Sequence, residues 1–122
     1  VHWKKGDLSI GEALVKQALG EGRYKLYKGW IPSRFDEVKG CDFSFVHVDV
    51  DIYQPTKDSI EFFYSRLTQG GIFLWDDYGF DKCPGATKAV DAFVIDKDEK
   101  MIELTDGGGF FIKGITVSRC VF

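Results

Sequence analysis

The sequence has no block of basic residues. Its 16 lysines and arginines are outnumbered by 19 aspartates and glutamates, and the formal net charge at pH 7 is −3. A protein that binds nucleic acid through a dedicated surface needs a patch or stripe of positive charge. We therefore expect no nucleic-acid partner.

Long apolar runs are also absent. No stretch approaches the roughly 20 apolar residues that a membrane-spanning helix needs, and the first residues, VHWKKGDLS, lack the apolar segment of a signal peptide. The three cysteines, Cys41, Cys83 and Cys120, are odd in number and lack the spacing of a metal site, so we expect reduced thiols. Together these absences predict a cytoplasmic protein without a membrane partner.

Bulky hydrophobic residues, in contrast, are plentiful. Eleven Phe, five Tyr and three Trp occur among 122 residues, and 44% of the chain is hydrophobic. A chain of this length can bury one modest core. Residues 1–122 are therefore expected to form a single domain.

Helix-like and strand-like segments alternate along the chain. Apolar residues at helical spacing predict helices over 10–18, 55–67 and 84–93, the first of them starting at a capping box of Ser9 and Glu12. Apolar or alternating segments predict strands at 23–29, 43–49 and 71–75, and residues 100–114 predict an antiparallel hairpin. This order predicts an α/β fold, with a mostly parallel sheet, helices on both faces and a C-terminal hairpin.

Two of these strands end in pairs of aspartates. Asp49 and Asp51 lie at the end of strand 43–49, in the sequence FVHVDVDIY. Asp76 and Asp77 follow strand 71–75, which has the sequence GIFLW. If the strands are neighbours, their ends lie about 5 Å apart and the carboxylates converge. Asp49, Asp76 and Asp77 would then suit Mg²⁺, which prefers oxygen ligands. The alternative is that these aspartates are helix N-caps and turn formers.

Two residues are candidates for proton transfer. The strand period of two places His47, Asp49 and Asp51 on one face. Asp51 lies one step past the predicted metal ligand and could accept a proton from a hydroxyl held there. His47 is the second catalytic candidate, although a histidine inside an apolar strand is more often a hydrogen-bonded core residue.

Three segments resemble the macrocin O-methyltransferase family. They are HVDVDIYQPTKDSIEFFYSRL, GGIFLWDDYG and CPGATKAVDAF, and the resemblance extends over at least residues 10–114. It implies a Rossmann-like class I methyltransferase that uses S-adenosylmethionine to methylate a hydroxyl of a small-molecule acceptor, in this family a sugar. It also implies that Asp49, Asp76 and Asp77 bind Mg²⁺ and that Asp51 acts as a base.

The resemblance is to the C-terminal half of such an enzyme. No G-x-G loop after an N-terminal strand is recognisable, and Gly107, Gly108 and Gly109 fall in the predicted hairpin turn. We therefore expect residues 1–122 to form a partial methyltransferase domain that lacks the N-terminal cofactor-binding strands. One edge of strand 43–49 would be exposed unless strand 23–28 covers it, and exposed edges pair with other chains. A homo-oligomer is expected.

Two other interpretations remain open. In the first, the chain is a truncated, non-catalytic binding or assembly domain. In the second, it is a Mg²⁺-dependent phosphatase of the haloacid dehalogenase class, in which Asp49 would attack phosphorus and Asp51 would be the acid/base. The short spacing after this motif leaves little room for the lysine that such phosphatases need.

Overall fold

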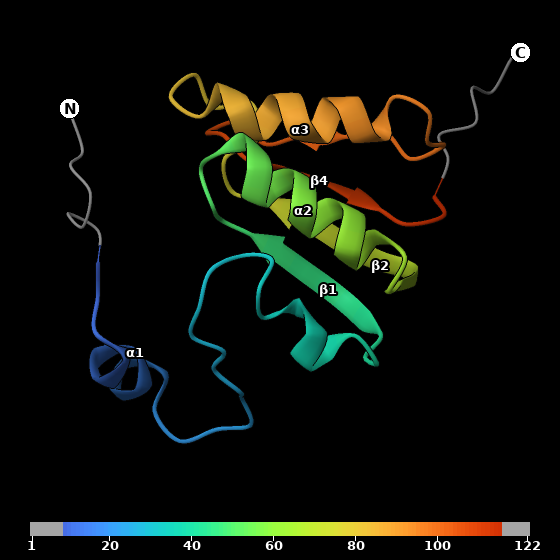
Figure 1. The fold of residues 1–122 in the computed structure, drawn as a ribbon. Coiled ribbons are helices and arrows are strands. Elements are labelled where there is room, and N and C mark those ends of the chain that lie inside the picture. Colours follow the sequence, from blue (N-terminus) through green and yellow to red (C-terminus); the bar gives the residue numbers. More distant parts are fainter. Residues whose placement is uncertain (1–8, 116–122) are drawn as a thin grey trace, which may run out of the picture.

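The computed structural model describes residues 9–115 of the chain (Figure 1). Its elements, in order, are α1 Glu12–Leu19, the 3-10 helix η1 Phe35–Val38, β1 Phe43–Val48, α2 Tyr53–Tyr64, β2 Leu67–Trp75, α3 Pro84–Val94, β3 Ile102–Glu103 and β4 Gly109–Ile112. The strands form one sheet in the order β1-β2-β4-β3. No helix among the described residues is long and apolar enough to cross a membrane.

The α/β fold class is confirmed, and the described sheet is mixed. Strands β1 and β2 run parallel, as predicted, because α2 returns the chain to the end of the sheet at which β1 begins. Strand β4 is antiparallel to both β2 and β3, so the predicted C-terminal hairpin is also confirmed. The parallel part is therefore smaller than expected, since it consists of the β1–β2 pair.

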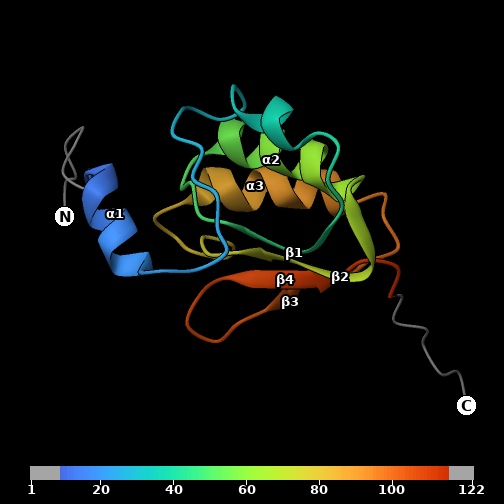
Figure 2. The ribbon, with the colours of Figure 1, turned by 90° about the horizontal axis from the view of Figure 1, so that it is seen from below.

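The core lies on one face of the sheet. Alternate residues of the strands, among them Val46, Phe73 and Phe111, are buried against Ile60 of α2 and Val90 of α3. Both helices cover this same face (Figure 2), so the expectation of helices on both faces is wrong for the described part of the chain.

The second face of the sheet is open among residues 9–115. Side chains that alternate with the buried ones point to it, and several of them are large and apolar, among them Phe45 and Ile72. Phe45 is 54% exposed and Ile72 is 36% exposed. Strand β1 also lies at the edge of the described sheet. This face and edge are unpaired apolar surface of the kind that associates with other chains.

Two predictions fail in the N-terminal part. Helix α1 has Gly11 as its N-cap without a side-chain cap hydrogen bond, so Ser9 does not form the predicted capping box. Residues 24–28 form no regular structure and do not pair with the free edge of β1. Helix α1 has no buried residue and lies apart from the sheet (Figure 1).

Candidate metal centre

The parallel register of β1 and β2 brings the aspartates together. Val48 pairs with Trp75, so the residues that follow them, Asp49 and Asp76, both lie at the C-terminal ends of the two strands. The backbone N–H of Asp76 donates to the carbonyl of Val48 at 3.0 Å and fixes this register. Carboxylate oxygens of Asp49, Asp76 and Asp77 all lie within 4.8 Å of one another. The predicted convergence of these three side chains is therefore observed.

Asp51 extends the cluster on the side of Asp77. Its backbone N–H donates to Oδ2 of Asp77 at 2.9 Å, and ligand atoms of Asp51, Asp77 and Cys83 lie within 4.8 Å of one another. Asp51 has φ = 60°, a left-handed conformation that aspartate tolerates better than most residues with a side chain. Because β1 has already ended at Val48, this turn, and not the strand period, positions Asp51.

The pKa values of two of these carboxyl groups, Asp49 and Asp51, are raised. Burial raises the pKa of Asp49, and the charges of Asp76 and Asp77 raise it further. The pKa of Asp51 is raised first by burial and then by Asp77. Burial and the same carboxylates raise the pKa of Cys83 to about 11, so this cysteine is a thiol at neutral pH. Close negative charges of this kind favour either protonation or a bound cation.

His47 lies beside the cluster on the open face of the sheet. Its side chain is 42% exposed, and Nε2 is 3.6 Å from Oδ1 of Asp76. It is not the buried core histidine that the apolar strand suggested. Through Asp76 it is close to the predicted metal ligands, and its charge lowers the pKa of Asp49.

The aspartates are not helix N-caps. The N-cap of α2 is Ile52 and that of α3 is Cys83, and neither makes a side-chain cap hydrogen bond. The N-cap part of the alternative is therefore wrong. Its other part, that the aspartates are turn formers, is borne out for Asp76 and Asp77, which lie in the turn that follows β2.

Helix α3 holds the loop that carries Asp76 and Asp77, a feature that the sequence analysis missed. The buried Tyr78 hydroxyl donates to Oδ1 of Asp91 at 2.7 Å, and the Gly79 N–H donates to Oγ1 of Thr87 at 2.9 Å. Thr87 and Asp91 are four positions apart, so they lie on one helix face. The sequence did contain a signal for this contact, namely two polar residues four positions apart in the helix that follows DDYG.

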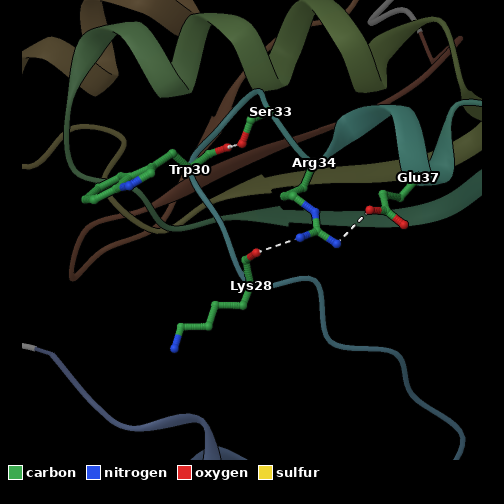
Figure 3. A network of polar contacts seen from close by, with 5 residues as sticks. All are labelled: Lys28, Trp30, Ser33, Arg34 and Glu37. Carbon is green, nitrogen blue, oxygen red and sulfur yellow. Dashed lines mark hydrogen bonds and ion pairs between the residues drawn. The ribbon is translucent and has the colours of Figure 1, made fainter.

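A second network holds the segment between α1 and β1 (Figure 3). The Arg34 guanidinium donates to the Lys28 carbonyl at 2.9 Å and to Oε1 of Glu37 at 2.6 Å. The Ser33 N–H donates to the Trp30 carbonyl at 2.8 Å. These contacts shape a turn on which the Trp30 side chain is left 83% exposed.

Comparison with known proteins gives a consistent result. A family model described as macrocin-O-methyltransferase (TylF) matches residues 7–112. One curated relative, 27% identical over 71 residues, is the Streptomyces olivaceus protein "8-demethyl-8-(2,3-dimethoxy-alpha-L-rhamnosyl)-tetracenomycin-C 4'-O-methyltransferase"; the match covers 58% of this chain and 27% of that protein.

Two solved structures share the fold. The O-methyltransferase NovP has a TM-score of 0.55 and 26% identity, over 59% of this chain and 30% of that one. The apo structure of CalS11, described as a TDP-rhamnose 3'-O-methyltransferase, has a TM-score of 0.60 and 23% identity, over 70% of this chain and 37% of that one. The chain thus spans well under half the length of these relatives.

Proposed function

The chain belongs to the macrocin O-methyltransferase family, and on this basis we propose that it forms the metal-binding part of an S-adenosylmethionine-dependent, Mg²⁺-assisted O-methyltransferase that acts on a sugar hydroxyl. The observation that carries the proposal is the convergence of Asp49, Asp76 and Asp77 at the end of the β1–β2 pair. The sugar is proposed because the curated relative is named for methylation of a rhamnosyl group.

The donor set fits Mg²⁺. It consists of carboxylate oxygens from three residues within 4.8 Å of one another, and Mg²⁺ is usually held by a few carboxylates, with water or substrate oxygens completing its coordination. When bound, the ion would supply positive charge that offsets the repulsion among the aspartates and favours ionisation of a nearby acceptor hydroxyl. Asp49, Asp76 and Asp77 would be its ligands.

Asp51 is the proposed proton acceptor. Burial and its carboxylate neighbours raise its pKa, which makes it a stronger base than an ordinary aspartate. The hydrogen bond from its own N–H to Asp77 holds it next to the metal ligands. His47 is retained as the alternative, since its Nε2 lies 3.6 Å from Oδ1 of Asp76.

S-adenosylmethionine would supply the methyl group, but we assign none of the described residues to its binding. Within residues 9–115 no strand is followed by a glycine-rich loop and a helix, and Gly107, Gly108 and Gly109 belong to the turn and start of β4. The non-catalytic interpretation therefore remains a second candidate for the chain by itself. The family match argues against the phosphatase interpretation.

Two binding measurements test the proposal. We expect Mn²⁺, used as a paramagnetic substitute for Mg²⁺, to bind the wild-type chain and to bind Asp76→Asn at least tenfold more weakly, a loss of about 1.4 kcal/mol. Equal Mn²⁺ affinity in both proteins would refute the metal site. Calorimetry with S-adenosylmethionine then separates the two candidates, because metal binding without cofactor binding would support the non-catalytic one.

A further inference from the structure

The open face of the sheet carries one continuous apolar patch across all four described strands. Six side chains make up this open-face patch: Phe45, Ile72, Leu74, Ile102, Phe110 and Ile112. Cross-strand partners share a face, and Ile72 and Leu74 link them into two rows that together reach from β1 to β3. Their neighbours Phe73 and Phe111 are buried on the other face. An exposed apolar patch of this extent marks an interaction surface.

Helix α1 carries an apolar stripe that matches this patch. Four exposed side chains recur at helical spacing along one side of the helix and just before it: Ile10, Ala13, Leu14 and Ala18. No residue of α1 is buried, and a helix this short is marginal in water unless it packs on a surface. The helix is about 12 Å long, and the four strands span about 14 Å from the first to the last. The stripe therefore fits the patch in length.

The position of α1 keeps the stripe off the patch of its own chain. One side of α1 encloses a hollow of about 190 Å³ with residues 26–28. The segment continues to Phe35, whose ring stacks on that of Phe62 in α2 with 4.6 Å between the centroids, and α2 covers the opposite face of the sheet (Figure 2). Moving α1 onto the patch of the same chain would break its contacts with residues 26–28. The stripe is thus available to another chain.

We propose that the chain forms a two-fold dimer in which α1 of each copy lies across the open-face patch of the other. A single contact between a two-turn helix and a four-stranded face is too small for a stable interface, which needs roughly 1,200 Å² of buried surface. Under two-fold symmetry the exchange is reciprocal, so the dimer forms this contact twice. None of the proposed metal ligands takes part, so this dimer and the proposed function can fail separately.

The first test compares two leucines of α1 by sedimentation equilibrium of the full chain. Leu14 and Leu19 are 55% and 50% exposed, but they are five positions apart and point in directions about 140° from each other around the helix. We expect Leu14→Glu to weaken the dimer at least tenfold and Leu19→Glu, the matched control, to leave its Kd unchanged. Neither leucine is buried within the single chain, so both variants keep the fold.

The second test mixes two variants that are each defective in one surface. Leu14→Glu impairs the stripe and Phe45→Lys impairs the patch, so each variant with itself has two damaged contacts. The mixed pair keeps one contact between wild-type surfaces, and in the other contact the two introduced charges have opposite signs. We expect the mixed pair to associate at least tenfold more tightly than either variant with itself.

A third measurement shows which chain supplies the helix. In a dimer of one isotope-labelled and one unlabelled copy, we expect isotope-filtered NOEs between the Leu14 methyl groups and the ring of Phe45 or Phe110. A chain that stays monomeric, or a dimer that Leu14→Glu does not weaken, would overturn the proposal. NOEs between these residues found only within one copy would also overturn it, because α1 would then cover the patch of its own chain.

Discussion

Asp49→Asn should stabilise the metal-free protein while weakening its response to Mg²⁺. The substitution keeps the size of the side chain and removes one charge whose oxygens lie within 4.8 Å of those of Asp76 and Asp77. Two unit charges at this distance repel by about 0.9 kcal/mol in a medium like water and by about 3.5 kcal/mol at an effective dielectric constant of 20.

The lower value applies here, because Asp49 is exposed. Two such pairs give roughly 2 kcal/mol, and salt screening reduces this to a gain of about 1 kcal/mol. For a domain of this size, that gain raises the melting temperature by about 4 °C. With Mg²⁺ present the sign reverses, since the variant has lost a ligand and gains less from the ion.

Thermal unfolding followed by circular dichroism, with and without saturating Mg²⁺, measures both effects. Asp42→Asn is the matched control, because Asp42 is an exposed aspartate just before the opposite end of β1. A metal-free variant that melts below the wild type would refute the argument from repulsion. An undiminished response to Mg²⁺ would show that Asp49 is not a ligand.

The pH dependence provides a further check on the same variant. The pKa values of Asp49 and Asp51 lie above the ordinary value of 3.8, so the folded state holds these protons more tightly than the unfolded chain. Their contribution to stability therefore rises as the pH falls through the folded-state pKa, and it is lost above that value. We expect a smaller gain between pH 7 and about pH 5 in Asp49→Asn than in the wild type.

Two further predictions concern the loop and the open sheet. Thr87→Val should weaken Mg²⁺ binding about fivefold in calorimetry, because the loss of one hydrogen bond to Gly79 costs about 1 kcal/mol. Thr87→Ser should keep the wild-type affinity for Mg²⁺. Equal weakening in both variants would contradict a positioning role for the hydroxyl. The unpaired edge of β1 and the exposed Phe45 should make the chain dimeric or larger in light scattering, and Phe45→Lys should shift it toward the monomer; a wild-type mass near 13.8 kDa at micromolar concentration would show that the sheet does not mediate association.

The metal centre was predictable because each step of its construction is local. An apolar segment without polar interruption, such as GIFLW before Asp76, has few alternatives to a strand buried on at least one face. Once β1 and β2 are parallel neighbours in register, the residues that follow them must lie close together at the C-terminal ends of the strands. The turn at Asp51 was not predictable, since a single φ value moves this side chain off the strand period.

The one-sided covering of the sheet could not be read from apolar content. Phe45 and Ile72 are as hydrophobic as Val46 and Phe73, yet only the latter pair is buried. Hydrophobicity states that a side chain favours burial, but which face the helices cover depends on connections along the whole chain. The segment 23–29 failed for a related reason. Its alternating pattern is compatible with a strand, but a strand forms only where the chain path brings the segment against a partner, and this segment does not pair with the free edge of β1.

The contiguous arrangement of β1, α2 and β2 has a consequence for how the chain folds. Asp49 and Asp76 are 27 positions apart, and the strands that carry them are joined by one helix. We predict that this strand–helix–strand unit forms the folding nucleus, because one helix makes the whole connection between the two strands. The carboxylates are then already close in the transition state, before the C-terminal hairpin pairs with β2. Their repulsion would then slow folding with little effect on the unfolding rate, and a divalent cation would speed folding as well as bind the folded protein.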